Sequence, residues 1–87
     1  MHIDSNNNLE IAQSIDTSGT RCPIPLLRAK QALKKMDVDQ ILEVIATDPS
    51  AKPDFDAMLK HLPHELILYQ SLCDSPRSDR FLIKKGA

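Results

Sequence analysis

The sequence has no tryptophan, and its 87 residues include only three aromatic ones, Phe55, Tyr69 and Phe81. A chain of this length forms one small domain, because two domains would each fall below the size at which a hydrophobic core suffices. The core must therefore consist mainly of aliphatic side chains, which supply most of the 41% hydrophobic fraction. So few aromatic rings also disfavour a surface that stacks unpaired nucleic-acid bases.

The sequence also lacks an excess of either charge. It has 11 Lys and Arg residues against 12 Asp and Glu residues, which gives a formal net charge of −1 at pH 7. A dedicated nucleic-acid-binding module is usually strongly basic. Direct binding to nucleic acid is therefore disfavoured on charge as well.

Cysteine is scarce and long apolar runs are missing. Two cysteines argue against the disulfide scaffold that small secreted domains build. The first residues do not resemble a signal peptide, and no segment approaches the roughly 20 apolar residues that span a bilayer. We expect a cytoplasmic protein that makes no contact with membranes.

The hydrophobic pattern predicts six elements in a single domain over residues 9–87, after a polar, disordered tail at residues 1–8. They are a strand at 9–16, a helix at 23–36, a strand at 41–47, a helix from 51 or 53 to 62, and strands at 66–72 and 80–85 joined by a polar turn at 74–79. The apolar stripe of the first helix consists of Leu26, Ala29, Leu33 and Met36. With short right-handed crossovers, the order β-α-β-α-β-β predicts an α/β (α+β) two-layer sandwich, in which two helices cover one face of a four-stranded mixed sheet.

Cys22 is the strongest candidate for a working residue. Pro23 follows it, and proline is favoured at the first position of a helix, which would make Cys22 the N-cap residue. The positive end of the helix dipole and the neighbouring Arg21 both favour a thiolate, so we expect a moderately lowered thiol pKa. Pro23 and Pro25 give the sulfur a stiff mount, but they remove two N–H groups from the helix start and leave that of Ile24 among the remaining donors.

The spacing around Cys22 excludes a local redox pair. In a Cys-x-x-Cys motif the residue three positions on would be a second cysteine, and here it is Pro25. A sulfur adduct on Cys22 has no neighbouring thiol to resolve it, so it persists until another protein removes it, as a carrier requires. The alternative for a free cysteine is a small buried hydrophobic residue. For Cys73, which ends an apolar strand, packing or chance exposure is the simpler interpretation.

Two aspartates and two histidines leave alternatives open. Asp16 and Asp48 both end predicted strands on the side of Cys22, so either one orients Arg21 or a partner, or serves only as a turn or cap residue. His61 and His64 are separated by a helix-breaking proline and have no evident third ligand. We therefore expect a surface histidine and a strand-entry histidine, and no metal site.

Several motifs occur together along the chain: Gly19-x-Arg21-Cys22-Pro23-x-Pro25, then Asp48-Pro49, then His64-Glu65-Leu66, and a closing Arg-Phe-Leu-Ile-Lys-Lys at 80–85. In this combination, over about residues 15–86, the sequence resembles the TusA/SirA/YedF-like family of sulfur carriers. The resemblance implies the same β-α-β-α-β-β sandwich, similar to the C-terminal domain of translation initiation factor three. Thr20 departs from the pattern, because a hydrophobic residue commonly stands before Arg-Cys-Pro, and the connection at 37–40 lacks the usual glycine.

The resemblance implies a carrier that accepts sulfane sulfur as a persulfide on Cys22. It implies a cysteine desulfurase as the donor and a downstream relay protein as the acceptor, with tRNA involved only indirectly. Family members of the TusA type serve 2-thiouridine synthesis in tRNA, and others serve sulfur oxidation, molybdenum-cofactor assembly or selenium metabolism.

We therefore predict a monomeric persulfide carrier of the sulfurtransferase type, without cofactor or metal. Cys22 is the predicted nucleophile, and the predicted supporting residues are Arg21, Pro23, Pro25, Asp16 and Asp48. Two alternatives come from other classes of protein: an RNA-binding module, and a regulatory adaptor that binds a partner without sulfur chemistry.

Overall fold

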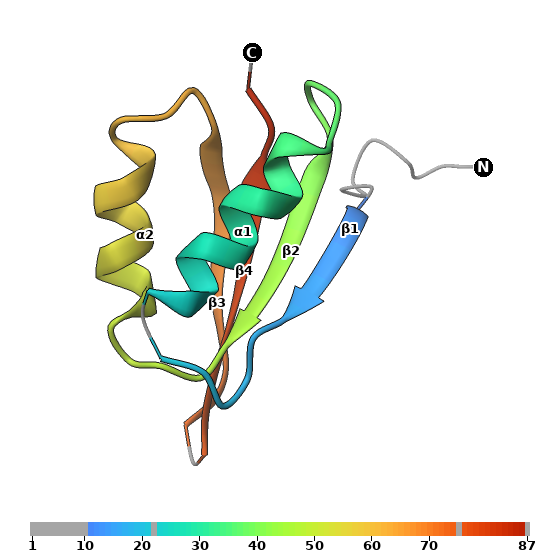
Figure 1. Cartoon of the computed structure of the whole chain (residues 1–87). Helices are drawn as coiled ribbons and strands as arrows, with labels where there is room; N and C mark the ends of the chain where they lie inside the picture. Colours follow the sequence, from blue (N-terminus) through green and yellow to red (C-terminus); the bar gives the residue numbers. More distant parts are fainter. Residues whose placement is uncertain (1–10, 22, 75, 87) are drawn as a thin grey trace, which may run out of the picture.

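Four strands and two helices follow one another in the predicted order. The computed structural model describes residues 11–21, 23–74 and 76–86, and the predicted tail at 1–8 lies outside this range. The elements are β1 (Ile11–Asp16), α1 (Ile24–Lys34), β2 (Ile41–Ala46), α2 (Ala51–Leu59), β3 (Glu65–Asp74) and β4 (Arg77–Lys84). Figure 1 shows both helices on the same face of the sheet. The predicted fold class is confirmed.

The sheet is mixed, with the strand order β1-β2-β4-β3. β1 runs parallel to β2, whereas β4 runs antiparallel to both β2 and β3. The parallel pair β1 and β2 is connected through α1, so the loops that follow both strands meet at one end of the sheet, where both strands finish (Figure 1). Arg21, the residue before Cys22 in the sequence, belongs to the first of these loops.

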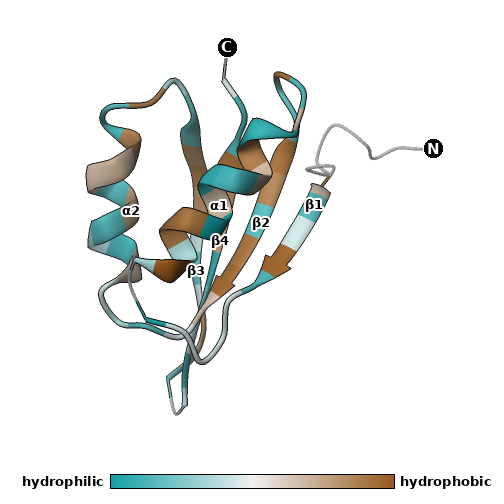
Figure 2. Cartoon of the chain, in the orientation of Figure 1, coloured by the Kyte–Doolittle hydropathy of each residue, from teal (hydrophilic) through white to brown (hydrophobic). Residues whose placement is uncertain are grey.

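The core lies between the sheet and the two helices. Alternate residues of β2 and β4 face the helices, and register pairs Leu42 with Ile83 and Val44 with Phe81, all four fully buried. Figure 2 shows the matching brown, hydrophobic segments along β2 and on the helices. The predicted stripe of α1 is confirmed: its buried members are Ala29, Leu33 and Met36, and Leu26 is partly buried against the same cluster.

The three aromatic side chains gather in one place within this core. The ring centroid of Phe81 lies 4.8 Å from that of Phe55 on α2 and 5.2 Å from that of Tyr69 on β3. Both ring pairs are tilted, an arrangement that aromatic rings favour over direct stacking. The cluster therefore joins α2 to the two strands beneath it.

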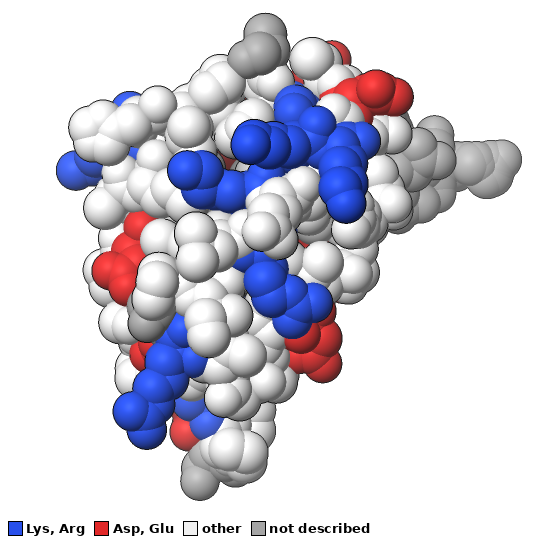
Figure 3. Space-filling model, in the orientation of Figure 1, with Lys and Arg blue, Asp and Glu red and all other residues white. Residues whose placement is uncertain are grey.

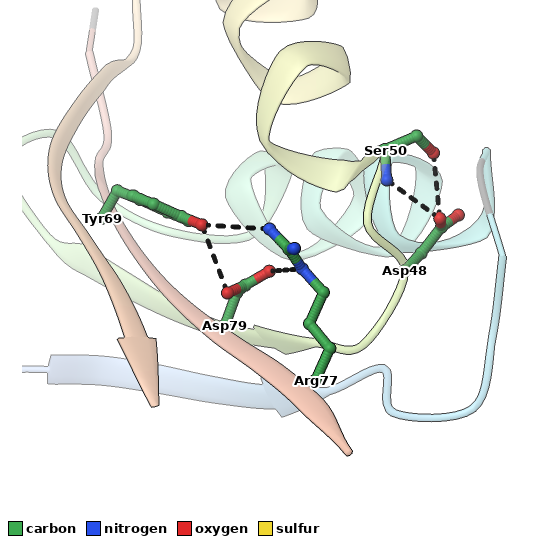
Figure 4. A network of polar contacts seen from close by, with 5 residues as sticks. All are labelled: Asp48, Ser50, Tyr69, Arg77 and Asp79. Carbon is green, nitrogen blue, oxygen red and sulfur yellow. Dashed lines mark hydrogen bonds and ion pairs between the residues drawn. The ribbon is translucent and has the colours of Figure 1, made fainter. Parts of the chain in front are cut away.

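The last hairpin is longer than predicted. The polar segment 74–79 was predicted as a turn, but β3 extends to Asp74 and β4 begins at Arg77. The polarity of this segment is misleading because Asp79 is fully buried: its carboxylate accepts hydrogen bonds from the Tyr69 hydroxyl (3.2 Å) and from Arg77 Nε (2.9 Å), as Figure 4 shows. A paired carboxylate can occupy an inward position that a free one would avoid.

Both helices end before their predicted limits of residues 36 and 62. After α1, the amides of Lys35 and Met36 donate to carbonyls only three residues back, which tightens the last turn. The connection to β2 has no glycine, and Asp39 instead adopts the left-handed conformation with a φ of 75°. Aspartate tolerates this conformation better than most residues, so it takes the place that glycine commonly fills.

A polar ladder crosses the face of the sheet opposite the helices. Glu43 of β2 accepts a hydrogen bond from the Ser14 hydroxyl on β1 (2.6 Å) and pairs with Arg80 on β4. Arg80 in turn donates to the side-chain oxygen of Gln70 on β3 (3.4 Å). The hydrogen bonds from Ser14 and Arg80 hold the pKa of Glu43 below its ordinary value. This ladder explains the one charged residue in the apolar run of β2.

Both outer strands deviate from regular pairing. The register of β1 against β2 shifts between Ile11 and Gln13. The register of β3 against β4 shifts twice, between Leu66 and Leu68 and again between Ser71 and Cys73. These shifts mark β-bulges or similar irregularities, which bend a strand and increase its twist.

The C-terminal residues close onto the start of β3. The Gly86 amide donates to Nδ1 of His64 at 3.0 Å, and the Lys85 ammonium donates to the Leu33 carbonyl at the end of α1. Partial burial and the nearby charge of Lys85 lower the pKa of His64 from its ordinary value of 6.5. His64 is thus a strand-entry histidine, as predicted, and it binds the backbone at Gly86.

We expect protonation of His64 to destabilise the fold. Because the pKa is lower in the folded state, the unfolded state binds the proton first, and the free energy of unfolding falls as pH drops below about 6.5. His64→Asn keeps an acceptor near the position of Nδ1, so it should flatten the pH dependence of the melting temperature between about pH 7.5 and pH 5. The control is His61→Asn, at an exposed histidine, which should keep the wild-type slope. An unchanged slope in His64→Asn would contradict this role.

Candidate functional site

The predicted nucleophile, Cys22, lies outside the described residues. Its neighbours in the sequence, Arg21 and Pro23, are described and show how the chain enters α1. Pro23 is the N-cap residue of α1, and α1 begins at Ile24. The predicted start, with Cys22 as N-cap and Pro23 as the first helical residue, is therefore wrong by one residue. The reason is that Pro23 has a ψ of 13°, outside the helical range, while its carbonyl accepts the first helical hydrogen bond, from Leu27.

The hydrogen bonding at this helix start also differs from the prediction. The amide of Ile24 was counted among the donors left for an anion, but it donates to the Arg21 carbonyl at 2.9 Å. Pro25 is the second helical residue and is buried against the core. The helix therefore offers fewer amides to an anion than an ordinary N-terminus, and the stiffening role of the two prolines stays a prediction.

The loop between β1 and α1 is tied to the neighbouring strand by side-chain hydroxyls. Both the amide and the hydroxyl of Thr17 donate to the Ile45 carbonyl on β2, at 2.8 and 2.7 Å. The Thr17 carbonyl accepts from both the amide and the hydroxyl of Thr20, at 3.1 and 2.6 Å. The Gly19 amide donates to the Thr47 hydroxyl at 2.9 Å. The backbone leading to Arg21 is therefore fixed from β1 and from β2.

Asp16 and Asp48 lie at the same end of the sheet, where the parallel strands β1 and β2 finish, as predicted. Asp16 accepts from the Ser18 amide at 2.9 Å. Hydrogen bonding from the Ser18 side chain and amide, together with the charge of Arg28, holds the pKa of Asp16 below its ordinary value. Asp48 accepts from both the amide and the hydroxyl of Ser50, each at 3.0 Å (Figure 4). Each carboxylate thus caps the turn that follows its strand, and the role of either one in orienting Arg21 or a partner stays a prediction.

An open pocket of about 470 Å³ lies between the loops that follow β1 and β2. Its lining residues are Gly19, Thr20, Arg21, Thr47, Asp48 and Pro49. Arg21 and Asp48 therefore face a common space, directly beside the sequence position of Cys22. A partner segment that enters this pocket would meet a cation and a carboxylate there.

The surface around the helix start is cationic. No acidic residue occurs between positions 17 and 36, a segment with five basic residues in a chain whose net charge is −1: Arg21, Arg28, Lys30, Lys34 and Lys35. Figure 3 shows Lys and Arg side chains spread over the face that carries α1. Ile24 and Leu27, one turn apart on α1, remain 45% and 52% exposed among them. We call this surface, from Arg21 to Lys35 on the outer side of α1, the α1 face.

The remaining candidate residues have simpler roles. Cys73 is exposed on β3 and pairs across the hairpin with Ser78, so of the two predicted interpretations chance exposure fits and packing does not. His61 is exposed. Within residues 11–21, 23–74 and 76–86, no three His, Cys, Asp or Glu side chains are grouped as metal ligands. The helices of this described part are all too short or too polar to cross a bilayer.

Sequence reasoning missed the contributions of Thr17 and Thr47. Both were assigned to turns or strand ends, which small polar residues commonly occupy. A signal was present in the spacing, since Thr17 and Thr47 each follow a strand by one residue and the two strands are parallel neighbours. The hydrogen bonds of Thr17 to Ile45 and of Gly19 to Thr47 could not be predicted, because they depend on the register between β1 and β2.

Comparison with known proteins gives a consistent result. The sequence model of the family described as "Sulfurtransferase TusA" matches residues 13–85. The "Sulfur carrier protein TusA" of Allochromatium vinosum is 45% identical over 74 residues, which cover 85% of this chain and 93% of that protein. A "Putative sulfur carrier protein" of Archaeoglobus fulgidus is 35% identical over 72 residues, 83% of this chain and 91% of the relative. The "Putative sulfur carrier protein YrkI" of Bacillus subtilis is 39% identical over 72 residues, 83% of this chain and 92% of the relative.

Proposed function

The chain belongs to the TusA family of sulfur carrier proteins, and from this premise we propose that Cys22 carries sulfur as a persulfide between two proteins. The observation that carries the proposal is the site itself. In the sequence, Cys22 directly follows Arg21 and comes two positions before the first residue of α1, after a loop whose Thr17 is hydrogen-bonded to β2. The absence of a second cysteine at position 25 leaves an adduct on Cys22 available to an external thiol.

The proposed reaction is a pair of exchanges at one sulfur atom. The Cys22 thiolate attacks the terminal sulfur of a persulfide on the donor, a cysteine desulfurase. The donor's sulfur–sulfur bond breaks, a new one forms on Cys22, and the donor leaves as a thiolate. An acceptor thiolate then attacks the terminal sulfur on Cys22 and releases the Cys22 thiolate. No external oxidant or reductant is consumed, and the positive charge of Arg21 favours the anion at each stage.

The destination of the sulfur follows from the family only as a proposal. We place the chain in a protein relay of the kind that leads to 2-thiouridine in tRNA, with tRNA meeting a later protein. The near-neutral net charge and the three clustered aromatic residues support a protein acceptor over direct RNA binding. The protein is proposed to act as a monomer in the cytoplasm.

The direct test is intact-protein mass spectrometry after incubation with a cysteine desulfurase and cysteine. We use a Cys73→Ser protein, in which Cys22 is the remaining cysteine of the chain. The expected product gains the mass of one sulfur atom and loses it on treatment with dithiothreitol. The reductant is essential because two added oxygens have nearly the same mass, and a sulfinic acid resists thiols. No reducible adduct with desulfurase, thiosulfate-loaded or polysulfide-loaded donors would overturn the proposal.

The α1 face is the proposed docking surface for the desulfurase. Its apolar centre of Ile24 and Leu27 is exposed, and cations surround it, so the matching partner surface has an apolar contact with an acidic rim. The apolar centre favours a protein partner over RNA. Charge around such a centre mainly affects the association rate, and salt screens it.

Charge reversal on the α1 face should slow sulfur transfer. Lys30→Glu/Lys34→Glu is expected to lower kcat/KM for transfer from the desulfurase about tenfold at low salt, with a smaller deficit at high salt. Lys60→Glu, at an exposed lysine beyond the end of α2, is the control with half of the charge change of the double variant, and it should transfer at nearly the wild-type rate. A loss in Lys60→Glu half as large, on a logarithmic scale, as the loss in the double variant would show that net charge alone matters. A gel shift with tRNA that is lost in the double variant would favour the RNA-binding alternative.

A further inference from the structure

The loop before position 22 contains more hydrogen bonds than its turn requires. A turn over residues 17–20 is closed by the Thr20 amide donating to the Thr17 carbonyl at 3.1 Å, with Gly19 in the left-handed conformation at a φ of 82°. The Thr20 hydroxyl donates to the same carbonyl at 2.6 Å. A side chain without a hydroxyl at position 20 would close the turn by the amide alone. The second bond therefore depends on the Thr20 hydroxyl.

The same loop is attached to β2 and to the segment after it. Thr17 is fully buried, and its amide and hydroxyl both donate to the Ile45 carbonyl. The Thr47 hydroxyl accepts the Gly19 amide at 2.9 Å. On the far side of position 22, the Ile24 amide donates to the Arg21 carbonyl at 2.9 Å. The described backbone before and after position 22 is thus hydrogen-bonded, and Thr20 and Thr47 line the same pocket as Arg21.

We infer that Thr17, Thr20 and Thr47 form a threonine clamp that positions Arg21 and the cysteine after it for sulfur exchange, with Thr20 as the positioning residue that completes it. The effect of the clamp on sulfur exchange rests on the proposed function of Cys22. A fixed loop keeps the thiolate beside Arg21 and the helix start, and it leaves less backbone freedom to be lost when a partner docks. Thr20 acts through the backbone and does not touch the transferred sulfur.

The test compares Thr20→Val with Thr20→Ser, both with Cys73→Ser so that Cys22 is the remaining thiol. Valine keeps the shape of threonine and removes the hydroxyl, whereas serine keeps the hydroxyl. We expect Thr20→Val to lower the rate of Cys22 alkylation by iodoacetamide at neutral pH, and kcat for sulfur transfer, by about fivefold, the fold-change that one net hydrogen bond corresponds to. The pH profile of alkylation should shift upward, because a loosened loop holds the thiolate less well. Thr20→Ser should restore both rates.

A second variant and a stability measurement separate positioning from folding. Thr47→Val removes the acceptor of the Gly19 amide and should shift the alkylation profile in the same direction. Melting temperatures identify any variant that is merely unfolded, and if Thr20→Val is unfolded, Thr47→Val provides the test in its place. Wild-type alkylation kinetics in Thr20→Val, or equal losses in Thr20→Val and Thr20→Ser, would overturn the clamp. Failure of the wild type to form a persulfide would instead overturn the proposed function, because alkylation does not depend on it.

Discussion

Replacing Cys22 by serine is expected to abolish sulfur loading while the protein remains folded. A serine hydroxyl is protonated at neutral pH and is a far weaker nucleophile towards sulfur, so the transfer rate should fall roughly a thousandfold or more, below detection. The measurement is the reducible sulfur adduct by intact mass, with the desulfurase and cysteine present. This is the largest functional effect that a single substitution in the chain should produce.

The control for this result is Cys73→Ser, at the exposed cysteine of β3. It should load sulfur at the wild-type rate, because Cys73 lies on the hairpin and pairs with Ser78. Circular dichroism should show both serine variants folded. A reducible adduct on Cys22→Ser would assign the chemistry to Cys73. Full biological activity of Cys22→Ser, with unchanged partner affinity, would instead favour the regulatory adaptor.

The largest effect on stability is expected from Phe81→Ala. Phe81 is fully buried on the central strand β4, opposite Val44 on β2, and its ring packs against Phe55 and Tyr69. Truncation of a buried phenylalanine costs about 3–5 kcal/mol, through lost transfer free energy and the cavity left behind. A domain of this kind has a total stability of about 5–15 kcal/mol, so the loss is a large fraction of the margin. Urea unfolding monitored by circular dichroism measures the change.

The matched control is Phe81→Leu, which keeps much of the volume and removes the ring contacts. It should cost about 1.5 kcal/mol, well below the alanine variant. A loss from Phe81→Ala no greater than that from Phe81→Leu would mean that the core collapses around the gap. In that case the aromatic cluster would not be the principal contact between α2 and the sheet.

The element order and the apolar faces could be predicted because they depend on the local spacing of hydrophobic residues. The stripe of α1 recurs every three or four residues, and β2 is a short apolar run, so each could be recognised without knowing its neighbours. The hairpin was misjudged because the inward position of Asp79 depends on Tyr69, ten residues away. No local pattern distinguishes a buried, paired aspartate from one in a turn.

The candidate site also has features that the local sequence predicts and features that it does not. The start of a helix directly after the segment Arg21-Cys22-Pro23 could be anticipated, because proline restricts the local backbone. The exact helix start at Ile24 could not, since it depends on ψ at Pro23. The contacts of Thr17 and Gly19 lie with residues 28 positions further along the chain. Such contacts follow from strand register, which only the folded sheet provides.

The register shifts in β1 and β3 affect how the sheet can pair with other chains. These are the two edges of the sheet, and an open edge presents unpaired amides and carbonyls to any other extended chain. An irregular, twisted edge cannot align a straight run of bonds with a second copy. Both edges carry such an interruption, and β3 carries two. The interruptions in β1 and β3 thus work against edge-to-edge pairing of the sheet with a second copy.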